Sequence, residues 1–414
     1  MTAKAKEIRR SSTKHDVLED SCSVLPPTWT ASTIGNVVVK TKQRDPRNLP
    51  NEVFRYVDVS SVSNESFRIT GSSSLLGSDA PSRARKSIAK NDILFATVRP
   101  TLKRIALVPE ELNGEIASTG YCILRADEAK VDSSFLYFSL LTDTFTARMA
   151  SIERGVSYPA VSDGDVLASK LILPPLPEQK KIAHILSTVQ RAIEAEERII
   201  QTTTELKKAL MQRLFTEGLR NEPKKQTKIG LVPKSWSLLP FDQFVTLQRG
   251  YDLRKQDFKQ GSVPVIGATQ VIGYHDTANV EAPGVTVVRS GSSAGKPLFI
   301  AEDFWAHNVL LYVKDFQGNH PKFVYYKILD LDLTQYRQGV AVPTLNRNTF
   351  SSVELALPSP REQQDIADAL DAVCNKTEIA SKKKAQLQDL FRSLLHELMT
   401  AKTRVRDLDR KVKN

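Results

Sequence analysis

One sequence pattern occurs twice in this chain, 184 residues apart. The string LPPLPEQKKIAHIL occupies Leu173 to Leu186, and LPSPREQQDIADAL occupies Leu357 to Leu370. The same register, without a gap, pairs residues on both sides of the strings: Gly155, Val156 and Pro159 with Gly339, Val340 and Pro343, and Leu206, Leu210 and Leu214 with Leu390, Leu394 and Leu398. A register of this length indicates that one structural unit has been duplicated.

A weaker similarity marks the start of each copy. LPPTW ends at Trp29 and VPKSW ends at Trp236, which is an offset of 207 residues, so loops differ in length between the copies. Each copy therefore begins near a Pro-x-x-Trp, continues through a region of strand-like alternation, and crosses a cluster of prolines. Each copy then ends in a long helix.

The two long helices are predicted over residues 176–217 and 359–402. Prolines tolerate the first helical turn because their missing N–H has no partner there, and Glu178 and Glu362 place negative charge near the positive end of the helix dipole. A heptad spacing follows in both copies. Its positions are Ile182, Leu186, Val189, Ile193, Glu196, Ile200, Thr203, Lys207, Leu210 and Leu214 in the first helix, and Ile366, Leu370, Val373, Thr377, Ala380, Lys384, Leu387, Phe391, Leu394 and Leu398 in the second.

A heptad pattern requires a partner helix, and the obvious partner is the helix of the other copy. Two helices related by an internal two-fold axis pair antiparallel. A register that places Glu196 opposite Lys384 and Thr203 opposite Thr377 would explain the polar residues in the middle of both patterns. The alternative is that each helix lies separately on its own domain.

The regions between these landmarks predict an α+β fold with internal pseudo-two-fold symmetry, in which β-rich domains are each followed by one helix of an antiparallel coiled coil. Short helices are expected near residues 133–149 and 321–333. The predicted divisions are an N-terminal tail at 1–23, a first domain at 24–175, a central helix at 176–217, a linker at 218–230, a second domain at 231–358, a distal helix at 359–402, and a C-terminal tail at 403–414. Both tails are charged, and we expect them to be loose.

The composition predicts a cytoplasmic protein with a polyanionic partner. The formal net charge is +11, which favours nucleic acid among possible partners. No apolar run is long enough for a membrane span or a secretion signal, so no membrane association is expected. The three cysteines are scattered and odd in number, as is typical of a reducing compartment.

No sequence motif indicates catalysis. The string GSSAGKP at Gly291–Pro297 is one residue short of a phosphate-binding loop, and Pro297 stands where a magnesium-binding hydroxyl belongs, so we interpret it as a turn between strands. Dinucleotide, nucleophile-elbow and zinc-ligand patterns are missing from the sequence. We therefore predict no catalytic, cofactor-binding or metal-binding residues, although carboxylates distant in sequence could still meet in space.

The repeated LPxxxxEQxxIAxxL string before a long helix resembles the specificity subunit of type I restriction–modification enzymes. The resemblance covers about Val24 to Lys402, with one small departure where Arg361 replaces the equivalent of Pro177. It implies a non-catalytic subunit with two target-recognition domains, each reading one half of a bipartite site in double-stranded DNA, while the helices set the spacer. It also implies two modification (methyltransferase) subunits that use S-adenosylmethionine, and motor-nuclease restriction subunits that use ATP and magnesium. Two alternatives stay open, namely a standalone nuclease with scattered carboxylates and a coiled-coil scaffold that binds DNA without reading sequence.

The candidate DNA contacts are basic and polar residues in loops, because arginine suits guanine and phosphate while Asn and Gln suit adenine. In copy one they are Arg83, Arg85, Lys86, Arg99, Lys103, Arg104, Arg154 and Tyr158. In copy two they are Arg249, Tyr251, Arg254, Gln270, Arg289, Ser292, Arg337, Asn346 and Arg347. The loops at Gly155 and Gly339 are equivalent in the repeat, which makes Arg154 and Arg337 the preferred pair. Ordinary solvated surface arginine is the competing interpretation for each of them.

Overall fold

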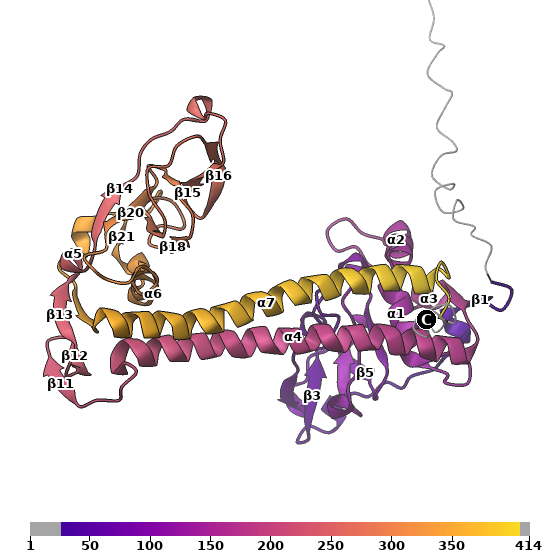
Figure 1. Cartoon of the computed structure of the whole chain (residues 1–414). Helices are drawn as coiled ribbons and strands as arrows, with labels where there is room; N and C mark the ends of the chain where they lie inside the picture. The colour runs from indigo at the N-terminus through magenta and orange to yellow at the C-terminus, as the bar shows by residue number, and fades with distance from the viewer. Residues whose placement is uncertain (1–25, 406–414) are drawn as a thin grey trace, which may run out of the picture. The chain divides into compact units, whose positions relative to one another are not determined.

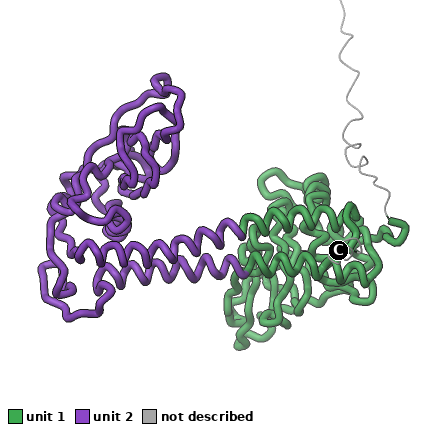
Figure 2. Tube along the Cα trace, viewed as in Figure 1, with its two compact units in different colours: residues 1–194, 384–414 green, residues 195–383 purple. Residues whose placement is uncertain are grey.

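The computed structural model describes residues 26–405, and the chain divides into two compact units (Figure 2). Unit 1 contains the residues up to Glu194 together with those from Lys384 onward, and unit 2 contains Ala195–Lys383. Both long helices cross the boundary, so each unit contains part of each helix. Tail residues 1–23 and 406–414 lie outside the described part of the chain, as do residues 24 and 25.

Unit 1 contains short strands, three short helices and the first part of helix α4. The strands are β1 (Thr30–Thr33), β2 (Val38–Val39), β3 (Val53–Val57), β4 (Ser73–Leu76), β5 (Ala84–Ser87), β6 (Ile93–Ala96), β7 (Ile105–Leu107), β8 (Ile116–Ser118), β9 (Tyr121–Ala126) and β10 (Lys170–Leu173). The helices are α1 (Ser133–Leu141), α2 (Asp143–Ile152), α3 (Asp163–Leu167) and α4 (Leu176–Glu217).

Unit 2 has the same kinds of element. Its strands are β11 (Lys224–Thr227), β12 (Gly230–Pro233), β13 (Ser237–Pro240), β14 (Thr246–Arg249), β15 (Val263–Gly267), β16 (Gln270–His275), β17 (Gly284–Val288), β18 (Pro297–Ile300), β19 (Trp305–Ala306), β20 (Leu310–Asp315), β21 (Arg337–Gln338), β22 (Thr344–Leu345) and β23 (Glu354–Leu357). Its helices are α5 (Phe241–Phe244), α6 (Pro321–Leu331) and α7 (Pro360–Met399).

The sheets of the two units have matching strand orders. The sheet β2-β9-β6-β7 corresponds to β14-β20-β17-β18, and β4-β3-β8 corresponds to β16-β15-β19, with a parallel β3–β8 or β15–β19 pair in each. Figure 1 labels β3 and β5 in unit 1 and β14, β15, β16, β18 and β20 in unit 2. The antiparallel pair β1–β10 likewise matches β13–β23. Strand β5 is an addition to the second sheet of unit 1. The duplication inferred from sequence is therefore present in the topology, and the α+β fold class is confirmed.

The long helices begin where the prolines predict. Helix α4 starts at Leu176, directly after Pro174 and Pro175, and α7 starts at Pro360. Helix α4 covers the residues expected for it, whereas α7 ends at Met399, short of Lys402. Ala401 adopts a left-handed φ of 58°, a conformation that terminates helices. The short helices expected near 133–149 and 321–333 are α1 with α2, and α6.

The repeated glutamine fastens each long helix to its own domain. Gln179 donates to the Pro174 carbonyl at 2.9 Å and accepts a bond from the Asp132 N–H, at the start of α1. Gln363 makes equivalent bonds with the Pro358 carbonyl and with the His320 N–H, at the start of α6. Both amides are almost fully buried, and a buried polar group needs such partners.

The repeated glutamate joins the start of one long helix to the chain just beyond the end of the other. In unit 1, Glu178 accepts two bonds of 2.8 Å from the Arg404 guanidinium and one of 3.2 Å from Trp29 Nε1. In unit 2, Glu362 accepts the Leu219 N–H at 3.1 Å, and Arg220 Nε lies 3.9 Å from its carboxylate. Arg220 and Arg404 are equivalent positions of the 184-residue repeat. This reciprocal contact gives a physical reason for the repeated glutamate.

The expectation of a loose C-terminal tail is wrong for its first residues. Arg404 is bound to Glu178 and lies 5.7 Å from the Trp29 ring, and Val405 is only 3% exposed. The charged composition of residues 403–414 gave no sign of this, because the partners lie more than 200 positions away in sequence. Strands β11 and β12 form an antiparallel hairpin that begins within the expected linker, 218–230.

Each unit packs parts of both long helices against its own sheets. In unit 1, Ile182 and Leu186 of α4 join Phe391 and Leu398 of α7 in one core cluster, and Phe391 lies 5.9 Å from Phe138 of α1. In unit 2, Leu214 and Phe215 of α4 share a cluster with Ile366 and Leu370 of α7, and Phe215 packs on Phe323 of α6. Low-numbered α4 residues meet high-numbered α7 residues in unit 1, and high-numbered α4 residues meet low-numbered α7 residues in unit 2, so the two helices run antiparallel. This packing excludes separate helices lying on separate domains.

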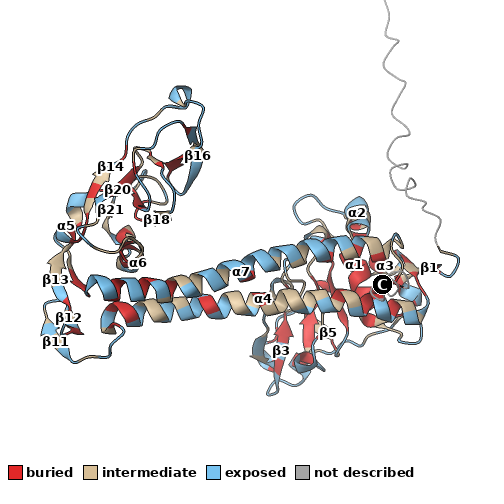
Figure 3. Ribbon diagram, viewed as in Figure 1, coloured by how far each residue is buried: buried red, intermediate tan, exposed pale blue. Residues whose placement is uncertain are grey.

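Every predicted heptad position is buried or half-buried, and exposed residues alternate with them along both helices (Figure 3). Thr377 donates to Thr203 Oγ1 at 2.8 Å, which is the threonine pairing expected from the sequence. Glu196, 6% exposed, forms a 2.6 Å ion pair with Lys383, the residue before the Lys384 expected opposite it. The polar residues of the helix pair therefore have partners, as fixing a register requires.

Replacing Thr377 by valine is expected to lower the free energy of unfolding by about 1 kcal/mol, because the buried Thr203 hydroxyl then loses one partner. Replacing both threonines by valine should cost less than the sum of the single changes, since apolar groups of the same shape then face one another. Urea unfolding of the two single variants and the double variant measures this coupling. Strict additivity would show that the two hydroxyls do not interact.

Candidate nucleic-acid interface

A basic cavity of about 530 Å³ lies in unit 2. Seven of its nine lining residues are polar or charged, three of these are arginines, and none is acidic: Gln248, Arg249, Arg289, Leu311, Gln338, Thr344, Leu345, Asn346 and Arg347. Strand β14 supplies Gln248 and Arg249, and the hairpin β21–β22 supplies Gln338, Thr344 and Leu345. The other four lining residues are Arg289, directly after β17, Leu311 of β20, and Asn346 and Arg347, directly after β22. Four predicted contacts from distant parts of the chain, namely Arg249, Arg289, Asn346 and Arg347, thus meet in one place.

The arginines of this cavity are oriented by backbone carbonyls. Arg347 donates to the Leu247 carbonyl at 2.6 Å, and Arg289 Nε donates to the Asn308 carbonyl at 3.2 Å. A carbonyl orients a guanidinium without neutralising its charge. Partial burial, together with the positive charge of Arg249, lowers the pKa of Arg289 below its ordinary value. The cavity therefore concentrates positive charge that an anion would stabilise.

Sequence reasoning missed three polar residues of the cavity, Gln248, Gln338 and Thr344. Gln248 donates to Tyr251 Oη at 2.7 Å, which places the predicted Tyr251 beside the cavity. Glutamine is a common reader of adenine, so the QRGY string around Arg249 could have suggested Gln248 as well.

The remaining candidates of copy two lie outside the cavity lining. Arg254 forms an ion pair with Asp257 at 2.8 Å, and Arg337 Nε donates to the Ala294 carbonyl at 2.6 Å. Gln270 is exposed at the start of β16, and Ser292 is exposed in the turn between β17 and β18. That turn is the GSSAGKP string, and Gly291 and Gly295 have φ values of 100° and 86° there, so the interpretation as a glycine turn is confirmed.

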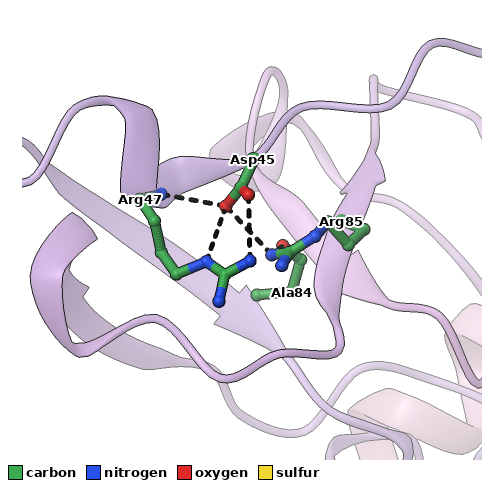
Figure 4. A network of polar contacts seen from close by, with 4 residues as sticks. All are labelled: Asp45, Arg47, Ala84 and Arg85. Atoms are coloured by element: carbon green, nitrogen blue, oxygen red, sulfur yellow. Dashed lines mark hydrogen bonds and ion pairs between the residues drawn. The ribbon is translucent and has the colours of Figure 1, made fainter.

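A second basic surface in unit 1 is formed by β5 and the loop at residues 42–47. Asp45 accepts bonds from Arg47 and Arg85, the latter at 3.0 Å, and the Arg47 bond in particular lowers the pKa of Asp45 (Figure 4). Backbone bonds from Arg44 to Arg85 and from Ser87 to Lys42 hold the loop against the strand. Arg83 is exposed beside them, whereas Lys86 pairs with Asp163. Sequence reasoning missed Lys42, Arg44 and Arg47, although they form a basic run in KQRDPR.

Other candidates of copy one are engaged within unit 1. Lys103 binds Asp143 and the Leu141 carbonyl, and Arg104 donates to the Val62 carbonyl. Arg154 makes two bonds of 3.1 and 3.2 Å to Asp165. Arg99 is exposed, and its guanidinium lies 5.1 Å from the ring of Tyr158, which is 72% exposed. Of the preferred pair, Arg154 is therefore paired with a carboxylate, whereas Arg337 binds only a carbonyl and keeps its charge, and a DNA contact by either one stays a prediction.

Within residues 26–405, no three His, Cys, Asp or Glu side chains are grouped so that they could hold a metal ion. Over the same part of the chain, no helix combines the length and apolar character needed to cross a membrane.

The family model of the type I restriction modification DNA specificity domain matches residues 26–205 and 233–389, one match for each copy of the repeat. A curated relative is the type I restriction enzyme MjaVIII specificity subunit of Methanocaldococcus jannaschii, 24% identical over 309 residues, which are 67% of this chain and 72% of that protein. The HindI specificity subunit of Haemophilus influenzae is 27% identical over 46% of this chain and 41% of its own length.

Solved structures agree with this match. A chain described under "complex assembly and conformational transition of the type I R-M system" is similar at a TM-score of 0.51 with 25% identity, over 90% of this chain and 98% of that one. The S subunit of a type I system from M. genitalium has the same fold at a TM-score of 0.64 with 16% identity, over 89% of this chain and 96% of that one. The duplicated domains, the paired long helices and the two family matches together show that this chain belongs to the family of type I restriction–modification specificity subunits, the non-catalytic subunits that carry DNA specificity.

Proposed function

We propose that each β-rich domain reads one half of a bipartite site in double-stranded DNA. In this proposal α4 and α7 set the unread spacer and dock two modification subunits, which carry S-adenosylmethionine and methylate adenine. Motor-nuclease restriction subunits join this complex and bring ATP and magnesium. The proposal places the protein in the cytoplasm, with its DNA.

The basic cavity of unit 2 is the observation that carries the proposal. Three guanidinium groups and four amide or hydroxyl side chains face one space without a carboxylate among them. Arginine can bind phosphates or the O6 and N7 acceptors of guanine, and glutamine and asparagine can bind adenine. A site that combines both residue types suits a protein that must hold the backbone and read base edges together.

Methylome sequencing tests the proposed function most directly. Cells that express this chain with its own modification subunits should carry methylated adenine in a motif of two short sequences separated by an unspecified spacer. Methylation that follows no motif would support the scaffold alternative. Magnesium-dependent cleavage by the purified chain alone would support the nuclease alternative.

Replacing Arg249 or Arg347 by alanine is expected to weaken binding of the assembled complex to its methylated motif by about 1–3 kcal/mol. If the lost contact is to a phosphate, the slope of log affinity against log salt should fall by about 0.9 for each variant. If the contact is to a base, discrimination in one half-site should relax instead. Fluorescence anisotropy at several salt concentrations separates these outcomes. Lys228→Ala is the control, because Lys228 is 83% exposed in the same unit, is paired with Glu354 and is not among the candidate contacts.

A further inference from the structure

Both domains carry a short hairpin whose tip holds two apolar side chains in solvent. Val156 is 100% exposed and Tyr158 is 72% exposed in unit 1, while Val340 and Val342 are 101% and 61% exposed in unit 2. These residues occupy the same positions of the 184-residue repeat, in the strings GVSYP and GVAVP. A single exposed valine is ordinary, but the same exposed pair on both copies of a duplicated domain calls for a common cause.

The tips are ordered by their own backbone geometry. Each begins with a glycine in the left-handed region, Gly155 at φ 98° and Gly339 at φ 86°, and each ends at a proline. In unit 1, Arg154 and Ala160 exchange two backbone bonds of 2.9 Å beneath the tip. In unit 2, β21 pairs with β22 beneath the tip. These short stems hold the apolar side chains away from the domain cores, where they contribute little to folding.

The stems stand beside cationic groups. In unit 2, Gln338 and Thr344 of the stem line the cavity that contains Arg249, Arg289 and Arg347. The Leu345 N–H donates to the Arg289 carbonyl at 2.7 Å, which fastens the stem to that cavity. In unit 1, the Arg99 N–H donates to the Pro159 carbonyl at 2.7 Å, and the Arg99 side chain lies against Tyr158. Each apolar tip therefore extends from a surface that suits an anion.

A DNA groove offers this combination of partners, with phosphates along its edges and apolar groups, such as thymine methyls, on the bases between them. We propose that the two tips enter grooves of the target duplex and make apolar contacts with base edges. Val156 and Tyr158 act in one half-site, and Val340 and Val342 act in the other. In this arrangement Arg154 and Arg337 shape the stems, and the valines beyond them contact the bases. The inference rests on the proposed function and adds a specificity-determining contact to it.

The test compares Val156→Thr, Val340→Thr and the double variant in the complex of the full chain with its modification subunits. Threonine keeps the β-branched shape and replaces a methyl with a hydroxyl, so folding of these exposed positions should be unaffected. Each single change should weaken binding to the methylated motif about tenfold, because one methyl contact is lost and the hydroxyl that replaces it is buried without a hydrogen-bond partner. Val53→Thr and Ile229→Thr, which alter exposed apolar residues outside the tips, are the controls and should bind normally.

Two further readouts distinguish a base contact from other roles. Because no phosphate contact is removed, the salt slope should stay unchanged, and each variant should relax sequence discrimination in one half-site only. Wild-type affinity and discrimination in both tip variants would overturn the proposal. Normal DNA reading with impaired assembly of the modification subunits would overturn it too, since the tips would then dock protein. If the unaltered complex reads no bipartite site, the proposed function fails first, and that outcome is visible before any variant is made.

Discussion

Replacing Arg404 by methionine should lower the free energy of unfolding of unit 1 by about 3 kcal/mol. Methionine keeps much of the apolar stem but removes both bonds to Glu178. The Glu178 carboxylate is only 16% exposed and would keep the bond from Trp29 Nε1. Removing one partner of a poorly hydrated ion pair is costly because the other charge stays behind. Calorimetry or urea unfolding measures the loss, and fluorescence of Trp29, the single tryptophan of unit 1, assigns it to that unit.

The repeat supplies a matched control at Arg220, the equivalent position. The Glu362 carboxylate is only 3% exposed, but the Arg220 Nε lies 3.9 Å from it, beyond hydrogen-bond distance, and the Arg220 side chain is 56% exposed. Glu362 keeps the bond from the Leu219 N–H when Arg220 is replaced. Arg220→Met should therefore cost no more than about 1 kcal/mol. Equal losses of unfolding free energy in Arg404→Met and Arg220→Met would contradict this expectation. They would mean that the geometry and burial of the contact do not determine how much each arginine stabilises its unit.

Replacing Gly250 by alanine should destabilise unit 2 by about 3 kcal/mol and also weaken DNA binding. The added Cβ would lie 2.2 Å from the His307 carbonyl oxygen and 2.5 Å from that of Ala306, and backbone atoms cannot rotate away. The end of β14 must then move, and the bond from the Tyr251 N–H to the Ala306 carbonyl at 2.9 Å is strained or lost. Arg249, the preceding residue, should leave its place in the cavity, so its phosphate or base contact should be lost as well.

Gly318→Ala is the control for this variant. Gly318 has a φ of 75°, but no atom lies within 4 Å of a Cβ placed there, so only the left-handed backbone conformation is penalised. That penalty is about 1–2 kcal/mol, and DNA binding should be unchanged. Unfolding by urea and anisotropy with the motif duplex measure the two effects. Full DNA affinity in Gly250→Ala would show that the position of Arg249 does not matter for binding.

Much of the fold could be predicted from the repeat, because helix starts and heptads are local patterns. Prolines and a first-turn glutamate mark the beginnings of α4 and α7, and the heptad predicted a partner helix for each. The pairing of Thr203 with Thr377 could also be predicted from the sequence. Two antiparallel helices related by an internal two-fold axis have few registers that bring their polar residues opposite one another.

The candidate interface was harder to predict, because residues far away in sequence decide whether an arginine is paired with a carboxylate or stays available to a ligand. Arg154 and Arg337 are in equivalent loops, yet Asp165 binds the first and the Ala294 carbonyl binds the second. Arg347 is oriented by a carbonyl 100 residues away. Gln338 and Thr344 both line the cavity because β21 pairs with β22, which places the two residues opposite each other.

The amino-acid sequence by itself determined that this protein is a duplicated unit with two long helices, because periodicity and proline placement act through neighbours along the chain. Only the tertiary structure decided that Arg404 fastens the end of α7 to the start of α4 within unit 1, and that Arg249, Arg289 and Arg347 share one cavity without a carboxylate. Such contacts depend on the spatial meeting of segments far apart in sequence, where burial and hydrogen bonding, and not residue type, decide which charges stay available to a ligand.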